Sequence, residues 1–256
     1  MNVNIRMQKR ILNEYKELND SREILKSSGI YFHFNEEDIT TLYALMIGQS
    51  DTPYQNGFYL FKFKYPDTYP MQPPVATYCT QGKLYDDKTK RHFSVRFNPN
   101  LYTCGKVCLS MLGTWRGPGW VPTNTIMNVL VAVQALVLND YPLRNEPGFE
   151  EAAKPVLESY NDIIFYANIK ISVLEMIETT PMEFIFFKDI MKNYFMENIE
   201  WYRNIMIHKQ IELNEKYPKK CLEAPCYGMK TMIEYDKLLE MLENIVLVGL
   251  AENMKI

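Results

Sequence analysis

The order of apolar and polar residues changes character along the chain, and each change predicts a different element. Residues 5–19 carry apolar side chains near one side of a helix, with basic residues spread over the rest. From residue 31 to residue 78, short runs rich in Tyr, Phe, Ile and Thr are separated by Gly and Pro, and the run 58–65 partly alternates. Such runs without intervening helices predict an antiparallel meander.

Helical spacing returns in the second half of the chain. Residues 123–138 repeat apolar positions at the spacing of a largely buried helix, and Thr123 is a plausible N-cap for it. The remainder of the chain holds three helical stretches rich in Met, Phe, Tyr and Ile, at 150–178, 182–216 and 231–248. Helices of this composition are stable only when their apolar faces are buried.

The domain organisation follows from these patterns, because no linker, repeat or low-complexity segment divides them. We expect an α+β protein with a core domain over residues 1–150. An all-helical extension over residues 151–256 should pack on that core in one continuous body. The alternative for the extension is that its apolar and Met-rich faces form a groove for a partner.

Composition excludes several classes of protein. The 256 residues are 47% hydrophobic and 23% charged, which is ordinary globular usage. A net charge of −3 argues against a nucleic-acid binder, and no apolar run approaches the roughly 20 residues of a membrane span. The N-terminal segment lacks the apolar core of a signal peptide. Five cysteines without zinc spacing predict neither a disulfide framework nor a metal site, and indicate a reducing compartment, the cytosol or the nucleus.

One irregular segment carries the candidate chemistry. Residues 97–120 read FNPNLYTCGKVCLSMLGTWRGPGW, with Cys108 eight residues after Asn100. Asn-Pro and Gly-rich segments cannot continue a helix or an inner strand, so a surface loop is expected here. Loops held by a rigid scaffold often carry reactive groups, which makes the Cys108 thiol a candidate nucleophile.

This segment resembles the active-site region of ubiquitin-conjugating (E2) enzymes, and three other motifs match the family in the same order. The match extends over roughly residues 5–150. Within the family, the chain looks most like the large E2 Z type, because of its Leu-Gly-Thr-Trp and Asn-Glu-Pro-Gly-Phe-Glu pieces and its helical tail. The giant E2 hybrids are the second choice. The other motifs are Ile47-Gly48 with Thr52-Pro53-Tyr54 and Gly57, the run from Tyr65 to Pro74, and Trp120-Val121-Pro122.

The resemblance implies the UBC fold: an N-terminal helix, a four-stranded antiparallel meander, an active-site loop and further helices. It also implies an enzyme that accepts ubiquitin or a ubiquitin-like protein from an activating enzyme (E1) as a Cys108 thioester. The modifier would then pass to a lysine of a protein substrate, usually with a ligase (E3). No cofactor is expected, since the E1 uses the ATP, and a monomer is expected. The alternative is a catalytically inactive E2-like binding module.

Attack of lysine on the thioester is the harder step, because the free amine is mostly protonated at neutral pH. The resemblance implies that Asn100 donates its amide to the developing oxyanion or braces the adjoining loop. It also implies that Asn145 or Glu146 orients the incoming lysine. The alternatives are a turn role for Asn100 and an ordinary exposed carboxylate for Glu146. His92, sixteen residues before the thiol, is a further candidate base.

Two partner surfaces are implied by the same resemblance. Lys9 and Arg10 in the first helix would dock the acidic ubiquitin-fold domain of the E1, although a solvated helix face also explains them. Tyr65 and Pro122 would form the ledge that receives the E3, although loop packing is equally consistent. The chain departs from the family at Asn98, where His is usual. It also has some four extra residues between Cys108 and the Trp120-Val121-Pro122 motif.

Overall fold

The computed structural model describes residues 5–86 and 89–253 and divides the chain into two compact units. The first unit contains residues up to Gln81 together with Arg96–Ala152. The second contains Gly82–Val95 together with the chain from Ala153 onward. The division after Ala152 lies close to the expected boundary at residue 150. That the extension packs on the core stays a prediction.

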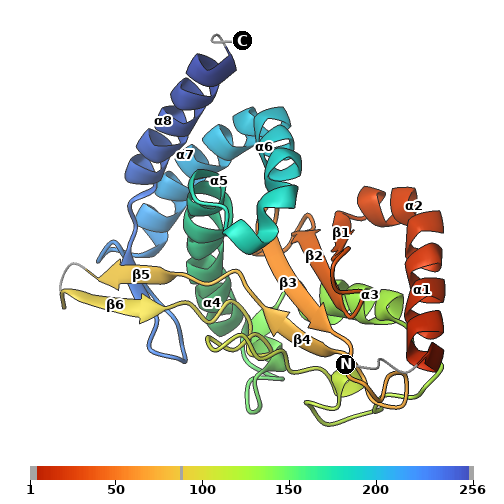
Figure 1. The fold of residues 1–256 in the computed structure, drawn as a ribbon. Coiled ribbons are helices and arrows are strands. Elements are labelled where there is room, and N and C mark those ends of the chain that lie inside the picture. Colours follow the sequence, from red (N-terminus) through yellow and green to blue (C-terminus); the bar gives the residue numbers. More distant parts are fainter. Residues whose placement is uncertain (1–4, 87–88, 254–256) are drawn as a thin grey trace. The chain divides into compact units, whose positions relative to one another are not determined.

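The first unit is built on the predicted antiparallel meander. Four strands are hydrogen-bonded in the order β1-β2-β3-β4, each antiparallel to its neighbour (Figure 1). The N-terminal helix and this sheet confirm the α+β class and the expected order of elements. The bounds are α1 Ile5–Asp20, α2 Arg22–Ser27, β1 Ile30–Phe34, β2 Thr41–Ile47, β3 Phe58–Lys64 and β4 Val75–Tyr78.

The inner strands of this sheet carry the core of the first unit. All seven residues of β2 are buried, and so are all residues of β3 except Lys62 and Lys64. Burial on both faces of a strand requires a covering layer on each side of the sheet. The nearly continuous apolar runs of β2 and β3 meet this requirement. For example, Leu45 of β2 pairs with Leu60 of β3, and both are fully buried.

The helix that follows the candidate site begins two residues later than predicted. It is α3, Ile126–Leu136, and its N-cap is Thr125 and not Thr123. The Thr125 side chain accepts the Asn128 N–H while the Asn128 side chain accepts the Thr125 N–H, so the two residues form a capping box. The first unit also contains two 3₁₀ turns, η1 Ser110–Leu112 and η2 Pro142–Asn145.

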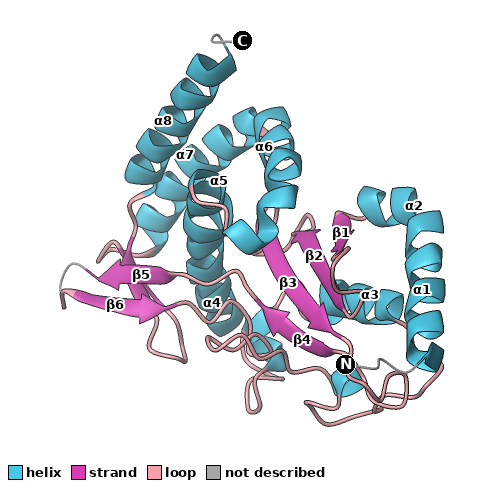
Figure 2. Ribbon diagram, in the orientation of Figure 1, coloured by secondary structure: helices cyan, strands magenta, loops and turns pink. Residues whose placement is uncertain are grey.

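The second unit is mainly helical, as Figure 2 shows by colour. Its long helices agree with the three predicted stretches, although the second stretch is divided between two helices. The bounds are α4 Lys154–Ala167, the π-helix η3 Asn168–Glu175, α5 Met176–Glu178, η4 Met182–Phe187, α6 Lys188–Glu197, α7 Ile199–Lys216 and α8 Tyr235–Asn253.

The extension is not all-helical, which corrects one expectation. A hairpin of β7 Cys221–Glu223 and β8 Lys230–Met232 separates α7 from α8. A second hairpin, β5 Lys83–Asp86 and β6 Arg91–Ser94, lies within the range 1–150 that was assigned to the core domain, but it belongs to this unit. It does so because β5 packs against β8, where the Thr231 hydroxyl donates to a β5 carbonyl at 3.2 Å.

Candidate functional site

The Cys108 backbone is held by Asn100, eight residues earlier in the chain. The Cys108 N–H donates to the Asn100 carbonyl at 2.8 Å. The bridge between Leu101 and Val107 pairs the two sides of this loop directly before the cysteine. Cys108 is a free thiol and is 1% exposed. The candidate nucleophile therefore lies on a closed, hydrogen-bonded loop of the first unit.

The Asn100 side chain makes a second bond to the same residue. Its Nδ2 donates to the Cys108 carbonyl at 2.6 Å, and the side chain is buried. Its Oδ1 is buried without a hydrogen-bond partner among the described residues. In this conformation the amide donor is therefore occupied by the backbone of the nucleophile, which agrees with the bracing role that was expected as one of two possibilities.

Asn98 replaces the histidine of the family pattern and supports the loop from beneath. It is fully buried, and its Nδ2 donates to the Val137 carbonyl at 2.6 Å and to the Tyr54 hydroxyl at 3.1 Å. Its Oδ1 accepts the Asn100 N–H at 2.7 Å. Burial raises the pKa of Tyr54, so this hydroxyl stays neutral at physiological pH. The asparagine thus fills the structural role expected at this position.

Asn145 belongs to the same hydrogen-bond network, and its expected role toward the substrate lysine stays a prediction. It ends η2, and its Nδ2 donates to the Leu136 carbonyl at 3.0 Å and lies 3.4 Å from the Asn98 Oδ1. A chain of neutral amides therefore runs from Asn145 through Asn98 and Asn100 to Cys108. Glu146 is the next residue and is half-buried, with its carbonyl accepting the Phe149 N–H at 3.0 Å. The predicted role of the Glu146 carboxylate stays a prediction.

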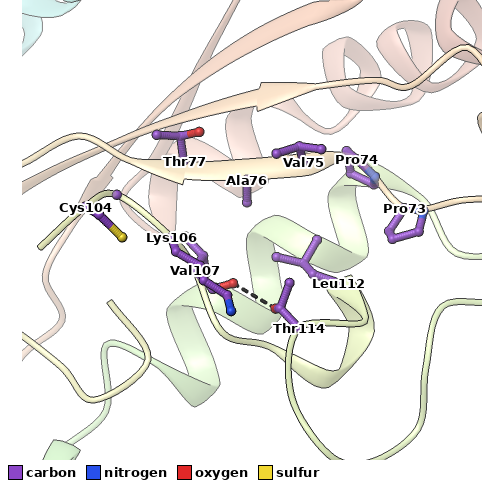
Figure 3. A pocket seen from close by; sticks show the side chains of 11 residues that line it. Pro73, Pro74, Val75, Ala76, Thr77, Cys104, Lys106, Val107, Leu112 and Thr114 are labelled. Atoms are coloured by element: carbon purple, nitrogen blue, oxygen red, sulfur yellow. Dashed lines mark hydrogen bonds between the residues drawn. The ribbon is translucent and has the colours of Figure 1, made fainter. Parts of the chain in front are cut away.

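A groove lies between the edge strand β4 and the segment that leads to the thiol (Figure 3). It has a volume of about 330 Å³ and is lined mostly by apolar atoms. Its lining includes Ala76 on β4, Cys104 and Lys106 on the segment before the thiol, and Leu112 after it. Cys108 itself is not a lining residue, so the groove runs beside the nucleophile and does not contain it.

The structure separates the two residues that were expected to dock the E1. Lys9 is exposed on α1 and is available to a partner. The Arg10 guanidinium instead pairs with the Glu14 carboxylate and donates to the Asn124 carbonyl at 2.8 Å. Glu14 is 2% exposed, so this pair links α1 to the segment before α3. The Arg10 charge therefore has a partner within the chain, and docking of the E1 by Lys9 and Arg10 stays a prediction.

Of the two residues expected to form the E3 ledge, Tyr65 is buried and Pro122 is exposed. Tyr65 is 2% exposed and packs edge-on against Tyr69 with ring centroids 4.7 Å apart, so it has no surface to offer a ligase. Pro122 is exposed, as are Val121 beside it and Met71 on the preceding loop. The correction for Tyr65 has a physical reason: its ring fills the space under this loop, and the neighbouring apolar residues form the exposed surface.

Two residues with important contacts were missed from the sequence, Glu14 and Thr114. The Glu14 carboxylate accepts the Tyr69 hydroxyl at 2.6 Å and the Ile126 N–H at 2.9 Å. A signal was present, because Glu14 lies three residues after Ile11 and four before Leu18, on the apolar side of the helix. A charge on that side indicates a buried partner. For Thr114, no signal in the sequence distinguished it from an ordinary loop residue.

Metal ligation and membrane insertion can be examined in the described ranges, 5–86 and 89–253. No three His, Cys, Asp or Glu side chains gather there in a way that could hold a metal ion. No helix of that part of the chain is long and apolar enough to cross a membrane. His92 lies on β6, where its ring is 4.9 Å from that of Tyr85.

Comparison with known proteins agrees with the resemblance seen in the motifs. A family model described as "Ubiquitin-conjugating enzyme" matches residues 10–170. "Ubiquitin-conjugating enzyme E2 Z" of Danio rerio is 36% identical over 202 residues, which cover 78% of this chain and 56% of that protein. The protein of the same name from Homo sapiens is 36% identical over 204 residues, which cover 77% of this chain and 51% of the other.

Further similarities occur to a plant protein and to a solved structure. "Probable ubiquitin-conjugating enzyme E2 25" of Arabidopsis thaliana is 38% identical over 173 residues, covering 63% of this chain and 26% of that protein. Among solved structures, human ubiquitin-conjugating enzyme E2 G1 is similar with a TM-score of 0.40 and 22% identity, over 50% of this chain and 92% of that one. This chain spans little more than half the length of the E2 Z proteins that it matches.

Proposed function

This chain belongs to the ubiquitin-conjugating enzyme family, and on that premise we propose that it accepts ubiquitin or a ubiquitin-like protein as a thioester on Cys108. The observation that carries the proposal is the position of this thiol. The N–H and the carbonyl of Cys108 are both hydrogen-bonded to Asn100. Asn98 in turn accepts the Asn100 N–H, and Asn145 donates to Asn98. A loop of this rigidity fits a nucleophile that must meet a large partner in one geometry.

The first step is an exchange between two thiols. The Cys108 sulfur attacks the carbonyl carbon of the E1-bound modifier, a new C–S bond forms, and the E1 cysteine leaves as the thiol or thiolate. One thioester replaces another, so the exchange is close to balanced in free energy and needs no strong base. A thiol is intrinsically nucleophilic even when only a few per cent is ionised. No cofactor is needed here, because the E1 uses the ATP.

The second step passes the modifier to a lysine of a protein substrate, usually with an E3. The amine nitrogen attacks the thioester carbonyl and a C–N bond forms, the C–S bond breaks so that Cys108 leaves as its thiolate, and the nitrogen loses a proton to water. Negative charge develops on the carbonyl oxygen, and an amide donor at that point lowers the barrier. Asn100 donates to the Cys108 carbonyl in the structure, and it serves this step by turning its Nδ2 from that carbonyl toward the thioester.

The partner surfaces of this proposal follow the exposed residues. The E1 is met through Lys9 on α1, and the E3 through Pro122, Val121 and Met71. Asn145 and Glu146 lie on the loop that the substrate lysine approaches. We place the activity in the cytosol or the nucleus and in a monomer.

An inactive E2-like binding module is the second candidate, and one observation favours it. Cys108 is only 1% exposed, whereas a working nucleophile must be reached by the E1 thioester. Activity therefore requires the Cys108 side chain to turn outward on its fixed backbone. In a binding module no such change is needed.

A charging assay separates the two candidates. The full chain is incubated with E1, ATP and ubiquitin, and the products are run on gels with and without reductant. We expect a conjugate larger by one ubiquitin that reductant removes. Cys108→Ser should lose it, while Cys104→Ser, which changes an exposed thiol four residues away, should keep it. If a panel of E1 enzymes and modifiers gives no reducible conjugate with the parent chain, the enzyme proposal is wrong.

A further inference from the structure

The Thr114 hydroxyl lies between the two peptide groups that flank Cys108. Its Oγ1 donates to the Val107 carbonyl at 2.8 Å, the bond drawn in Figure 3, and accepts the Leu109 N–H at 2.9 Å. The Leu109 carbonyl is farther away, at 3.2 Å. A hydroxyl has one hydrogen to donate and lone pairs to accept with, so the two shorter contacts can be made at the same time.

Together, Thr114 and Asn100 bond every polar backbone group around the nucleophile. Asn100 bonds the Cys108 N–H through its carbonyl and the Cys108 carbonyl through its Nδ2. Thr114 bonds the carbonyl before the cysteine and the N–H after it. Val107 and Leu109 are 1% and 5% exposed, so water has little access to replace these partners. The thiol is therefore carried by a backbone without a free hydrogen-bonding group.

The local chain path explains how Thr114 reaches this position. After Cys108 the chain forms η1, and Gly113 then adopts the left-handed conformation with φ of 67°. A Cβ at Gly113 would meet no atom within 4 Å, so the conformation and not the space requires glycine. The turn brings the Thr114 N–H to within 3.3 Å of the Leu109 carbonyl and closes the loop. The Gly- and Pro-rich segment that lengthens this chain begins directly afterwards.

We propose that Thr114 is a positioning residue for Cys108, an inference that rests on the proposed thioester function. Its hydroxyl fixes the backbone on both sides of the thiol. It also occupies the Leu109 N–H, the amide directly after the nucleophile, which in other acyl-transfer sites serves as an oxyanion donor. With that amide engaged, Asn100 is left to donate to the thioester oxygen.

The test replaces the hydroxyl and keeps the shape. Thr114→Val removes both bonds and strands a buried carbonyl and a buried N–H, whereas Thr114→Ser keeps the hydroxyl and is the matched control. Charging from E1 is measured in single turnovers over a range of E1 concentrations. We expect Thr114→Val to lower the maximal charging rate about tenfold while the concentration for half-maximal rate is unchanged, because the E1-facing surface is untouched. Thr114→Ser should stay within about twofold of the parent.

A second measurement does not depend on charging. Each cysteine is alkylated with iodoacetamide in the folded chain, and its rate is followed by mass spectrometry of the peptides. Freeing the backbone should make Cys108 react several times faster in Thr114→Val, while Cys79 in the same unit and Cys221 in the other keep their parent rates. Those two thiols report any general loosening of the fold.

The outcomes separate the two proposals. A Thr114→Val chain that charges at the parent rate, or whose Cys108 reacts at the parent rate, overturns the positioning role. Equal acceleration of all the cysteines also overturns it, since the hydroxyl would then support only general stability. If the parent chain accepts no modifier, the proposed function fails, and the alkylation rates still decide whether Thr114 fixes Cys108.

Discussion

Replacing Asn100 with alanine distinguishes a chemical role for its amide from a bracing role. In the structure the amide bonds the Cys108 carbonyl at 2.6 Å, and its own Oδ1 is buried with no partner among the described residues. Alanine removes both groups. The loss of the bond leaves a buried carbonyl unsatisfied, which typically costs about 1–3 kcal/mol. Removing the unpartnered oxygen ends a penalty of about the same size.

These two effects oppose each other, so the net change in the free energy of unfolding should be no more than about 1 kcal/mol. The effect on catalysis is expected to be larger. Loss of one oxyanion donor typically slows acyl transfer by about 10²–10³, or about 2.7–4 kcal/mol. We therefore predict that Asn100→Ala is charged by E1 within a few-fold of the parent rate. It should then transfer the modifier to free lysine about 100 times more slowly.

The assay measures both steps on the same preparation. Charging is followed in single turnovers, and the isolated thioester is then mixed with lysine over a series of concentrations. Urea unfolding gives the stability of each chain. Asn13→Ala, the same substitution on the exposed face of α1, is the control for preparation and folding. Asn100→Asp keeps the shape but removes the Nδ2 donor, and it should slow transfer to lysine as alanine does.

An equal loss of the charging rate and of the rate of transfer to lysine would refute the chemical role of Asn100. If charging and transfer fall by the same factor, and that factor follows the loss of stability, the amide only braces the loop. An unchanged rate of transfer to lysine would refute the oxyanion role just as directly. In either case Asn100 would retain the contact seen in the structure and no more.

Two further predictions concern the scaffold of the first unit. Glu14→Ala breaks a buried ion pair with Arg10 and leaves two donors without an acceptor. It should therefore lower the free energy of unfolding, measured with urea, by about 3–5 kcal/mol, whereas the exposed Glu17→Ala should lower it by about 0.5 kcal/mol or less. Equal effects of the two substitutions would contradict the buried network. Burial works to raise the pKa of Asp38, but hydrogen bonds from Lys64 and nearby threonines outweigh it and hold the pKa well below its ordinary value. The stabilising effect of the Asp38 carboxylate is therefore present above the unfolded pKa of about 3.9 and is lost as pH falls through the folded pKa. The difference in free energy of unfolding between the parent and Asp38→Asn should be constant near neutral pH and shrink below about pH 4. A constant difference down to pH 2 would contradict this.

The sheet and the loop of the candidate site could be predicted from the sequence because their signals are local. The partly alternating run at 58–65 became β3, and turn residues bounded each strand as expected. Four motifs in the order of the family pattern carried the resemblance, and the family model matches residues 10–170. Short elements carry no such signal. The three residues of β7 are too few to show a period, and the α7–β7 segment therefore looked like a turn between helices.

Partners distant in the sequence were the main cause of error. The Arg10 charge looked free on a helical wheel, because neither Asn124 nor the burial of its Glu14 partner can be deduced from the spacing of α1. Periodicity reports which side of an element is buried, and it does not report what covers that side. Tyr65 illustrates the same limit, since its place after a strand gave no sign that Tyr69 would pack on its ring.

The groups that hold the nucleophile share one chemical property, which bears on how the site works. Asn98, Asn100, Asn145 and Thr114 are all neutral, and within the described residues no carboxylate or imidazole is hydrogen-bonded to the Cys108 side chain. A charged partner would be needed if thioester formation had to be driven by ionising the thiol, as in a cysteine protease. In the proposed reaction an acyl group passes from one thiol to another, and that exchange has no such need. Under the proposed function, a neutral scaffold would fix the geometry of the sulfur in both steps, and deprotonation of the attacking lysine would depend on other groups. On this view the sequence change from His to Asn at residue 98 costs nothing chemically, because the position supplies hydrogen bonds to Val137 and Tyr54 and not a proton.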